Sequence, residues 1–262
     1  MRRFDAEATA RDVVTGLDLR GRTALVTGGA GAMGREVGAA LAAAGATVVL
    51  ADVDPPPAGF ESVTLDLASL DAVRDFARGW VAARRPLHML VNNAGVMACP
   101  ERRTADGHEL QFGVNFLGHW YLATALLPAL ERGAQEIGEA ARIVSVSSIA
   151  HRRSDIYWDD VDYRTRPYER WEAYGQSKTA CALLALVSTE RMQGHGVVCN
   201  ALNPGGAMTG LMRHLSQEEL RANGWLDAEG RPPARSRSAA QCAATATWAA
   251  SAPELAGIGG LY

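Results

Sequence analysis

The stretch TALVTGGAGAMGREVGAALAAAGATVVLAD, residues 23–52, decides the fold of this chain. It begins with a short apolar strand (23–28), passes through glycines into an alanine-rich helix (35–45), and closes with a second strand (47–52). Gly45 ends the helix, as glycine often does because it adopts a left-handed backbone without strain. Two strands joined by a helix predict a βαβ unit, in which both strands lie parallel in one sheet.

The same alternation continues along the chain. Further strands are expected at 62–67, 87–95, 141–148 and 197–206, with a last short one in GIGGLY at 257–262. Helices are expected at 69–84 and at about 105–132, where Pro128 should bend or end the helix. The pattern predicts one α/β domain, a doubly wound (Rossmann) parallel sheet with helices on both faces.

The domain organisation follows from where this alternation starts and where it is interrupted. Residues 1–20 are expected to form a polar N-terminal extension with helical character, and residues 21–262 the domain itself. Two long irregular stretches, 149–172 and 207–238, interrupt the alternation. Loops of this length in a compact domain are usually functional, so both are predicted to contact substrate.

Composition excludes several classes of function. The 262 residues are 48% apolar and 21% charged with a net charge of −3, which gives no electrostatic reason to bind nucleic acid or an anionic membrane. The longest apolar runs, such as ACALLALV at 180–187, are too short to span a membrane, and the N-terminus has no apolar signal core. Four scattered cysteines and six scattered histidines predict reduced thiols, no metal site and a cytoplasmic protein.

A glycine-rich loop joins the first strand to its helix. Gly29, Gly31 and Gly34 fit G-x-G-x-x-G at the start of a helix, where a dinucleotide pyrophosphate binds. Asp52 ends the second strand, at the distance where a carboxylate accepts hydrogen bonds from the adenosine ribose. That carboxylate would repel a 2′-phosphate, and Val53 beside it is not basic, so NAD is favoured over NADP. Asp66, at the end of the third strand, could receive the adenine amino group.

Tyr174 and Lys178, in EAYGQSKTA (172–180), lie one helical turn apart. An ammonium group beside a phenol stabilises the phenolate form, which suits proton transfer. The spacing therefore makes Tyr174 a candidate acid/base.

These motifs occur in a characteristic order. TGGAGAMG (27–34), NNAG (92–95), Asn115 in GVNFLGH, SVSS (145–148), YGQSK (174–178) and NPGGAMT (203–209) follow one another as they do in the short-chain dehydrogenase/reductase family, which residues 20–262 resemble. The segment 92–127 is similar in particular to the retinol dehydrogenase and WW-domain oxidoreductase branch. Two features depart from the pattern: Ala32 replaces the usual middle glycine, and the loop also fits T-G-x-x-G-x-x-G of the longer nucleotide-sugar epimerases.

The resemblance implies roles for individual residues. Tyr174 would be the acid/base, Lys178 would tune it and bind the nicotinamide ribose, and Ser148 would hydrogen bond the substrate oxygen. Asn115 would hold a water that connects Lys178 to solvent. Pro204 and Gly205 would shape the nicotinamide pocket, and Thr209 would bond the carboxamide. The further cofactor contacts would be Gly28, Gly31, Met33, Gly34, Asp52, Asp66, Leu67, Asn93, Ala94, Gly95 and Ala207.

The segment between Ser148 and Tyr174 is rich in aromatic residues. Six of the twelve Trp and Tyr residues lie between 157 and 174. Aromatic side chains at a pocket entrance favour a bulky, hydrophobic, cyclic substrate. The predicted substrate contacts are Ser148, Trp158, Trp171, Tyr174 and Met208. The alternative is that these aromatics only fix the insertion to the domain.

The predicted function is that of an NAD-dependent oxidoreductase that interconverts a secondary alcohol and a ketone. An epimerase, dehydratase or enone reductase would use the same Tyr-Lys pair, and a non-catalytic NAD-binding regulator is a further alternative. The segments 179–187 and 119–127 are apolar nearly all round their helices. A second apolar face indicates burial against another subunit, so a homodimer or homotetramer is expected.

Overall fold

A computed structural model describes residues 4–234 and 236–262 of the chain. Six strands form one sheet, and every strand pairs in parallel with its neighbours. In sheet order they are β3 (Glu61–Thr64), β2 (Thr47–Asp52), β1 (Thr23–Thr27), β4 (Met89–Asn92), β5 (Ala141–Val146) and β6 (Val197–Leu202). This order confirms the predicted doubly wound α/β fold.

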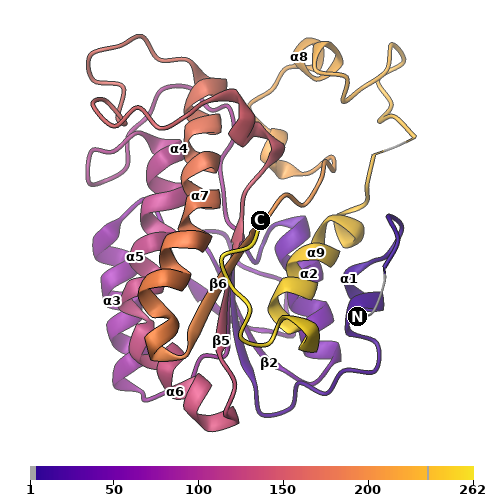
Figure 1. The fold of residues 1–262 in the computed structure, drawn as a ribbon. Helices are drawn as coiled ribbons and strands as arrows, with labels where there is room; N and C mark the ends of the chain where they lie inside the picture. Colours follow the sequence, from indigo (N-terminus) through magenta and orange to yellow (C-terminus); the bar gives the residue numbers. More distant parts are fainter. Residues whose placement is uncertain (1–3, 235) are drawn as a thin grey trace.

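Helices cover both faces of the sheet (Figure 1). On one face lie α3 (Leu70–Ala82), α5 (Gly118–Ala125), α6 (Leu127–Ile137) and α7 (Arg170–Met192), whose apolar side chains share one core with the sheet. On the other face lie α1 (Ala10–Val14), α2 (Ala32–Ala43) and α9 (Ala239–Ser251), which enclose a second core. Strands buried on both faces explain the near-continuous apolar runs of the sequence.

The long helix expected at about 105–132 is divided into four parts. It begins with α4 (Leu110–Phe112), widens into a π-helical turn (Gly113–Leu117), and continues as α5. Leu126 separates α5 from α6, and Pro128 lies in the first turn of α6, where the missing N–H costs no hydrogen bond. The predicted interruption near Pro128 is therefore present, but the helical region ends at Ile137 rather than 132.

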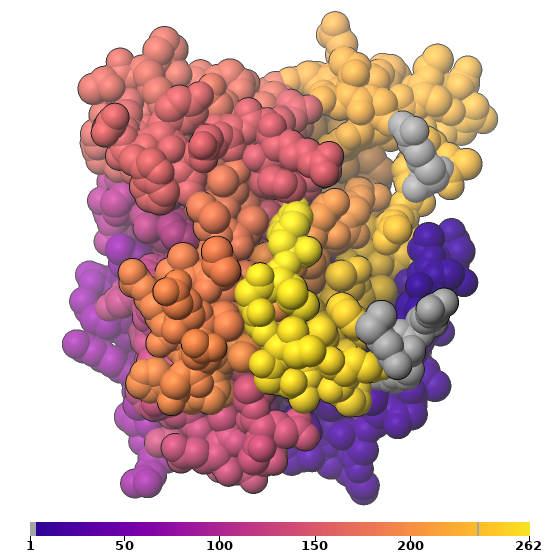
Figure 2. Space-filling view, viewed as in Figure 1, coloured from indigo at the N-terminus to yellow at the C-terminus, as the bar shows by residue number. Residues whose placement is uncertain are grey.

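The segment GIGGLY, expected to form a last strand, is not a strand in the part of the chain that the structure describes. The segment still runs along β6, because the Ala201 N–H donates to the Leu261 carbonyl and the Gly260 N–H donates to that of Cys199, both at 2.8 Å. Figure 2 shows this segment, in yellow, on the surface beside α7, in orange. Glycines that weaken regular pairing account for the loss of strand geometry.

The N-terminal extension, expected to be polar, buries apolar side chains against the domain. Within its described residues, 4–20, Thr9 caps α1, and Ala10 and Val14 are buried in the core that α9 shares. The segment is thus attached to the domain by an apolar contact.

The four cysteines are all buried and unpaired.

Among residues 4–234 and 236–262, no helix is long and apolar enough to cross a membrane. Nor do three His, Cys, Asp or Glu side chains of the described residues gather as a metal ion would require.

Candidate active site

The site is built where the sheet order reverses, between β1 and β4. The carboxyl ends of these neighbouring strands carry two loops, the glycine loop 28–34 and the NNAG loop 92–95. Crevices at such a switch point are where ligands bind in open α/β sheets. Gly28 has φ +71°, and a Cβ there would lie 2.7 Å from Asn93 Nδ2 and 2.9 Å from Ala94 Cα. The two loops are therefore in direct contact, and glycine is required between them.

Glycines also set the packing of α2. A Cβ on Gly34 would lie 2.2 Å from the Gly28 carbonyl oxygen, and one on Gly29 would lie 2.6 Å from Leu50 Cβ. Gly31, the N-cap of α2, is exposed, and no side chain among the described residues caps this helix. The first N–H groups of α2 are therefore available to an anion, which fits a pyrophosphate. The adjacent Met33 packs on the core beneath.

The two predicted adenosine contacts differ in exposure. Asp52 ends β2, and its Oδ2 accepts a hydrogen bond from the Ala30 N–H at 2.8 Å, so the carboxylate lies beside the glycine loop. Asp66 is exposed beyond the end of β3, and its Oδ1 accepts from the Ala68 N–H at 2.8 Å. Leu67 is buried, and a Cβ on Gly118 would lie 3.0 Å from Leu67 Cβ.

Gly95 leaves a polar cradle next to the helix that carries Tyr174. A Cβ on Gly95 would lie 3.1 Å from Asn115 Oδ1 and 3.7 Å from Lys178 Nζ. A group that enters the space beside Gly95 therefore meets an acceptor and an ammonium donor. This donor set fits the hydroxyl groups of a nicotinamide ribose.

Asn115 has more protein partners than the resemblance implied. Its Nδ2 donates to the Val96 carbonyl (3.0 Å) and to Ser177 Oγ (2.9 Å), and its Oδ1 accepts from the Val96 N–H (2.8 Å). The backbone carbonyl of Asn115 accepts hydrogen bonds from His119 Nδ1 (2.9 Å) and Cys181 Sγ (3.2 Å). A water held by Asn115 would have to use the one remaining lone pair of Oδ1.

Tyr174 and Lys178 lie on one face of α7 and are both buried, at 4% and 5% exposure. Lys178 Nζ lies 5.7 Å from the centre of the Tyr174 ring and donates to the Val146 carbonyl at 2.9 Å. Among the described residues, none hydrogen bonds to the Tyr174 hydroxyl, although the ring is enclosed. The hydroxyl is therefore available to a ligand.

Two neighbouring tyrosines show the contrast. Burial and a hydrogen bond from Tyr163 to Glu172 raise the pKa of Tyr163, and burial next to Glu109 raises the pKa of Tyr168. Both phenols are held in their neutral form. Of these three tyrosines, only Tyr174 has a lysine beside its ring and a hydroxyl without a protein partner.

Three serines at the end of β5 differ in whether their hydroxyls donate a hydrogen bond to the protein. Ser145 Oγ donates to the Cys181 carbonyl (2.9 Å) and Ser147 Oγ to the Lys178 carbonyl (2.7 Å), so both fix α7 to the sheet. Ser148 is half-buried, and its hydroxyl accepts from the Ala150 N–H at 3.2 Å. Its own hydrogen is therefore free for another acceptor. Of these three serines, Ser148 is the one whose hydroxyl could donate to a substrate oxygen, the role that the resemblance implies for it.

The predicted aromatic contacts separate into two groups. Trp171 lies 6.5 Å from the Tyr174 ring, centre to centre, in a nearly perpendicular arrangement. Trp158 is 74% exposed and does not belong to the apolar cluster around Tyr174. Tyr157 and Tyr163 hold the guanidinium of Arg166 between them, at 3.8 and 3.6 Å from their ring centres. These last aromatics contact another residue of the same insertion, 149–172.

The segment 207–238 covers this end of the sheet. It contains a 3-10 turn (Gly210–Met212) and α8 (Gln217–Ala222), and an ion pair joins Arg170 of α7 to Glu219 of α8. Its apolar side chains pack on Tyr174. The cluster, which we call the Tyr174 cluster, consists of Met97, Ala98, Ala150, Tyr174, Met212, Leu220 and Leu226 with the partly buried Trp171, Leu211, Leu215 and Trp225.

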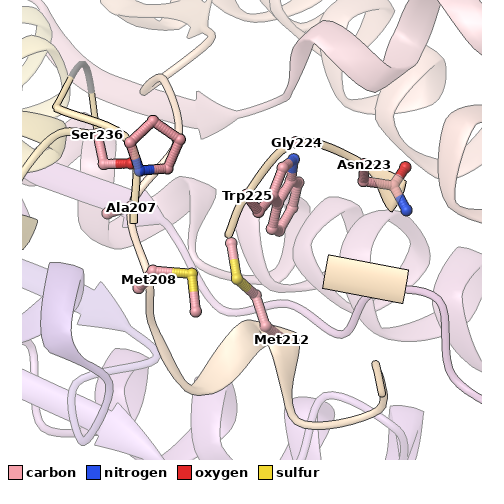
Figure 3. A pocket seen from close by; sticks show the side chains of 9 residues that line it. Ala207, Met208, Met212, Asn223, Gly224, Trp225 and Ser236 are labelled. Atoms are coloured by element: carbon pink, nitrogen blue, oxygen red, sulfur yellow. The ribbon is translucent and has the colours of Figure 1, made fainter. Parts of the chain in front are cut away.

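A cavity of about 240 Å³ lies within this segment, because all nine residues that line it fall between Gly206 and Ser236. Figure 3 shows the side chains of Met208, Met212 and Trp225 pointing toward one another across it. Gly206 and Ala207 form its wall on the side of β6. The loop between β6 and the cavity carries the half-buried Pro204, Gly205 with φ +84°, and Thr209, whose Oγ1 accepts from the Leu211 N–H.

The sequence of the chain is similar to those of known oxidoreductases. Residues 22–220 match the family model described as short chain dehydrogenase. The chain belongs to the short-chain dehydrogenase family. A probable oxidoreductase of Streptomyces antibioticus is 43% identical over 94% of this chain and 85% of its own length. Human retinol dehydrogenase 13 is 36% identical over 98% of this chain and 82% of its own length.

Among solved structures, the RhlG/NADP active-site complex of Pseudomonas aeruginosa is similar, with a TM-score of 0.66 and 27% identity. It covers 90% of this chain and 91% of its own chain. The protein is thus an oxidoreductase of the short-chain dehydrogenase family, and the family implies a nicotinamide dinucleotide as cofactor.

Two buried residues of the site were not predicted from the sequence. Thr27 Oγ1 accepts from the N–H groups of Asn93 (2.9 Å) and Ala94 (3.0 Å), and His119 Nε2 lies 2.8 Å from the same oxygen. The position of His119, four residues after Asn115 and hence on the same side of its helix, was the available signal.

Proposed function

We propose that the protein interconverts a secondary alcohol and a ketone with NAD as the hydride carrier. One observation carries the proposal: an enclosed Tyr174 whose hydroxyl has no partner among the described residues, one turn from a buried lysine. The ring of Tyr174 is buried, but its oxygen is not among the buried unpartnered side-chain atoms of the described residues, so it is accessible to a substrate, whereas the hydroxyls of Tyr163 and Tyr168 bond to protein groups.

Residues of the chain itself transfer the proton. When bound, the nicotinamide supplies or accepts the hydride. As the phenolate, Tyr174 Oη takes the hydroxyl proton of the alcohol; as the phenol, it gives its proton to the ketone oxygen in the reverse direction. Lys178 stabilises the phenolate that begins the first step and ends the second, because its ammonium charge lies close to the ring. Ser148 donates to the substrate oxygen, where negative charge develops during transfer.

NAD is preferred over NADP because of Asp52. The Asp52 carboxylate accepts a hydrogen bond from the Ala30 N–H and so lies beside the glycine loop. There it can accept hydrogen bonds from the two hydroxyls of the adenosine ribose, and its charge repels a 2′-phosphate. The glycine loop, the uncapped start of α2 and the cradle at Gly95 would hold the rest of the cofactor.

The substrate is proposed to be hydrophobic and cyclic. The cavity within the segment is lined by Met208, Met212 and Trp225 among others, and the last two also belong to the Tyr174 cluster. Its volume of about 240 Å³ is below the range of roughly 300–1,000 Å³ typical of sites for drug-sized ligands. A molecule of several rings therefore requires the segment 207–238 to move outward, as substrate loops commonly do.

A substrate series at fixed NAD tests this function, from 2-propanol through cyclohexanol to multi-ring alcohols, with NADH absorbance as the readout. We expect kcat/KM to rise with ring size, because each added ring buries more apolar area. A flat or falling series would contradict the substrate class, and no NADH with any alcohol, together with no NADH consumption with ketones, would contradict the redox assignment. An epimerase or dehydratase would convert its substrate with no net change in NADH, which product analysis distinguishes.

A further inference from the structure

His119 is a fully enclosed histidine between the two halves of the site. It lies in α5, 2% exposed, with one ring nitrogen on Thr27 at the end of β1 and the other on the Asn115 carbonyl. Neither contact faces a ligand directly. The side chain instead joins the strand that leads into the glycine loop to the π-helical turn that contains Asn115.

The hydrogen-bond pattern fixes the tautomer. Thr27 Oγ1 already accepts two N–H groups, those of Asn93 and Ala94, so its own hydrogen must be donated. The nearer acceptor is His119 Nε2 at 2.8 Å, whereas the Val91 carbonyl is 3.4 Å away. His119 Nδ1 therefore carries the proton and donates it to Asn115. A neutral imidazole is the form that supplies one donor and one acceptor.

From Asn115 the network reaches the catalytic helix. Asn115 Nδ2 donates to Ser177 Oγ, and Ser177 Oγ donates to the Tyr174 carbonyl at 2.8 Å. Cys181, one turn beyond Ser177, donates its thiol to the same Asn115 carbonyl that His119 uses. A continuous chain of buried hydrogen bonds thus runs from the NNAG loop, through His119, to the turn of α7 that presents Tyr174.

We propose that His119 is a positioning residue, which sets the distance between the cofactor loops and the Tyr174–Lys178 turn. The inference rests on the proposed function, since it assigns His119 to the assembly of that same site. Without the imidazole, the Thr27 hydroxyl and the backbone carbonyl of Asn115 lose their shared partner, and the hydrogen bonds between Val96 and Asn115 remain to join the NNAG loop to this helical region. We expect cofactor affinity to fall for this reason, because the loop that lines the cofactor crevice is held by fewer contacts.

The test compares two buried histidines of the same fold. His88 is also 2% exposed and also bonds the backbone, accepting from the Thr23 N–H at 2.9 Å, but it lies at the opposite end of the sheet. His119→Phe and His88→Phe each remove one buried imidazole and keep an aromatic ring. His119→Gln supplies one amide donor and one acceptor, so it can replace both bonds. For each variant, the dissociation constant of NADH is measured by fluorescence titration and the unfolding midpoint by circular dichroism.

We expect His119→Phe to weaken NADH binding on the order of tenfold, the effect of one lost buried hydrogen bond. His119→Gln should recover most of this affinity, and His88→Phe should leave it unchanged at a similar loss of unfolding midpoint. Equal NADH affinities in the two Phe variants, or no recovery in His119→Gln, would overturn the positioning role. If His119→Phe does not fold, His119→Ala and His88→Ala take the place of the two Phe variants: a weaker NADH affinity in His119→Ala than in His88→Ala supports the role, and equal affinities refute it. An unmodified protein that binds no NADH would refute the proposed function and this inference together, whereas binding without turnover would refute only the alcohol–ketone assignment.

Discussion

Acid pH should destabilise the folded protein through His119 in particular. Burial, together with the nearby charge of Lys178, lowers the pKa of His119 from its ordinary 6.5 to about 4, although the hydrogen bond to Asn115 acts in the opposite direction. Between these two values the unfolded chain binds a proton at His119 and the folded chain does not. The free energy of unfolding must therefore fall as the pH falls from about 6.5 to about 4.

The two pKa values set the size of the effect. At about pH 5, linkage gives a loss of about 2 kcal/mol relative to about pH 7.5, and at lower pH the loss approaches about 3 kcal/mol. This is a large part of the roughly 5–15 kcal/mol that stabilises a typical domain. Other groups also titrate in this range, including His88, whose pKa is lowered chiefly by burial. The contribution of His119 must therefore be isolated by comparison with a variant.

The assay is urea unfolding of the unmodified protein and of His119→Gln at about pH 5 and about pH 7.5. Glutamine does not titrate, so the variant should lose about 2 kcal/mol less between the two pH values than the unmodified protein does. The comparison depends only on the change with pH, and any constant loss of stability from the substitution cancels. Equal pH dependence in the two proteins would show that the folded protein does not hold His119 neutral at about pH 5, which would contradict the effect of burial.

Three further outcomes are expected. Asp52→Ala should narrow the preference for NAD over NADP, as judged by kcat/KM with each cofactor, because a carboxylate that repels the 2′-phosphate is gone; equal use of both cofactors by the unmodified protein would contradict the assignment. Trp171→Ala should reduce kcat/KM for multi-ring alcohols by about tenfold, in line with the loss of an aromatic contact beside Tyr174, whereas the exposed Trp158→Ala should have little effect; the reverse order would place substrate elsewhere. Leu186, 57% exposed on α7, should lie in a subunit interface, so light scattering should give a dimer or tetramer that Leu186→Glu weakens, and a monomer at micromolar concentration would refute this.

The fold was predictable because its elements are specified locally. The apolar runs that became β1, β2 and β5 need only periodicity and their neighbouring breakers to be recognised. The ends of elements were less accurate: the strand expected at 197–206 stops at Leu202, and that at 62–67 stops at Thr64. Each ends where parallel pairing with a neighbouring strand ends, which depends on contacts distant in sequence.

The site was predictable where the chemistry is local and not where it depends on packing. Tyr174 and Lys178 lie within one helical turn, so the sequence alone brings them together. His119 and Thr27 are 92 residues apart, and no local pattern indicates that they touch. The difference between Trp158 and Trp171 likewise depends on tertiary packing, because Trp171 packs in the Tyr174 cluster and Trp158 is exposed.

The central claim, that Tyr174 transfers the proton, is tested most directly by Tyr174→Phe, with Tyr157→Phe as the matched control. Tyr157 lies in the preceding insertion and is 46% exposed, away from the Tyr174 cluster. With the best alcohol of the substrate series at saturating NAD, we expect Tyr174→Phe to lower kcat on the order of 10² to 10⁴ while its NADH affinity is unchanged. Tyr157→Phe should turn over at the rate of the unmodified protein. Near-normal turnover by Tyr174→Phe would contradict the account.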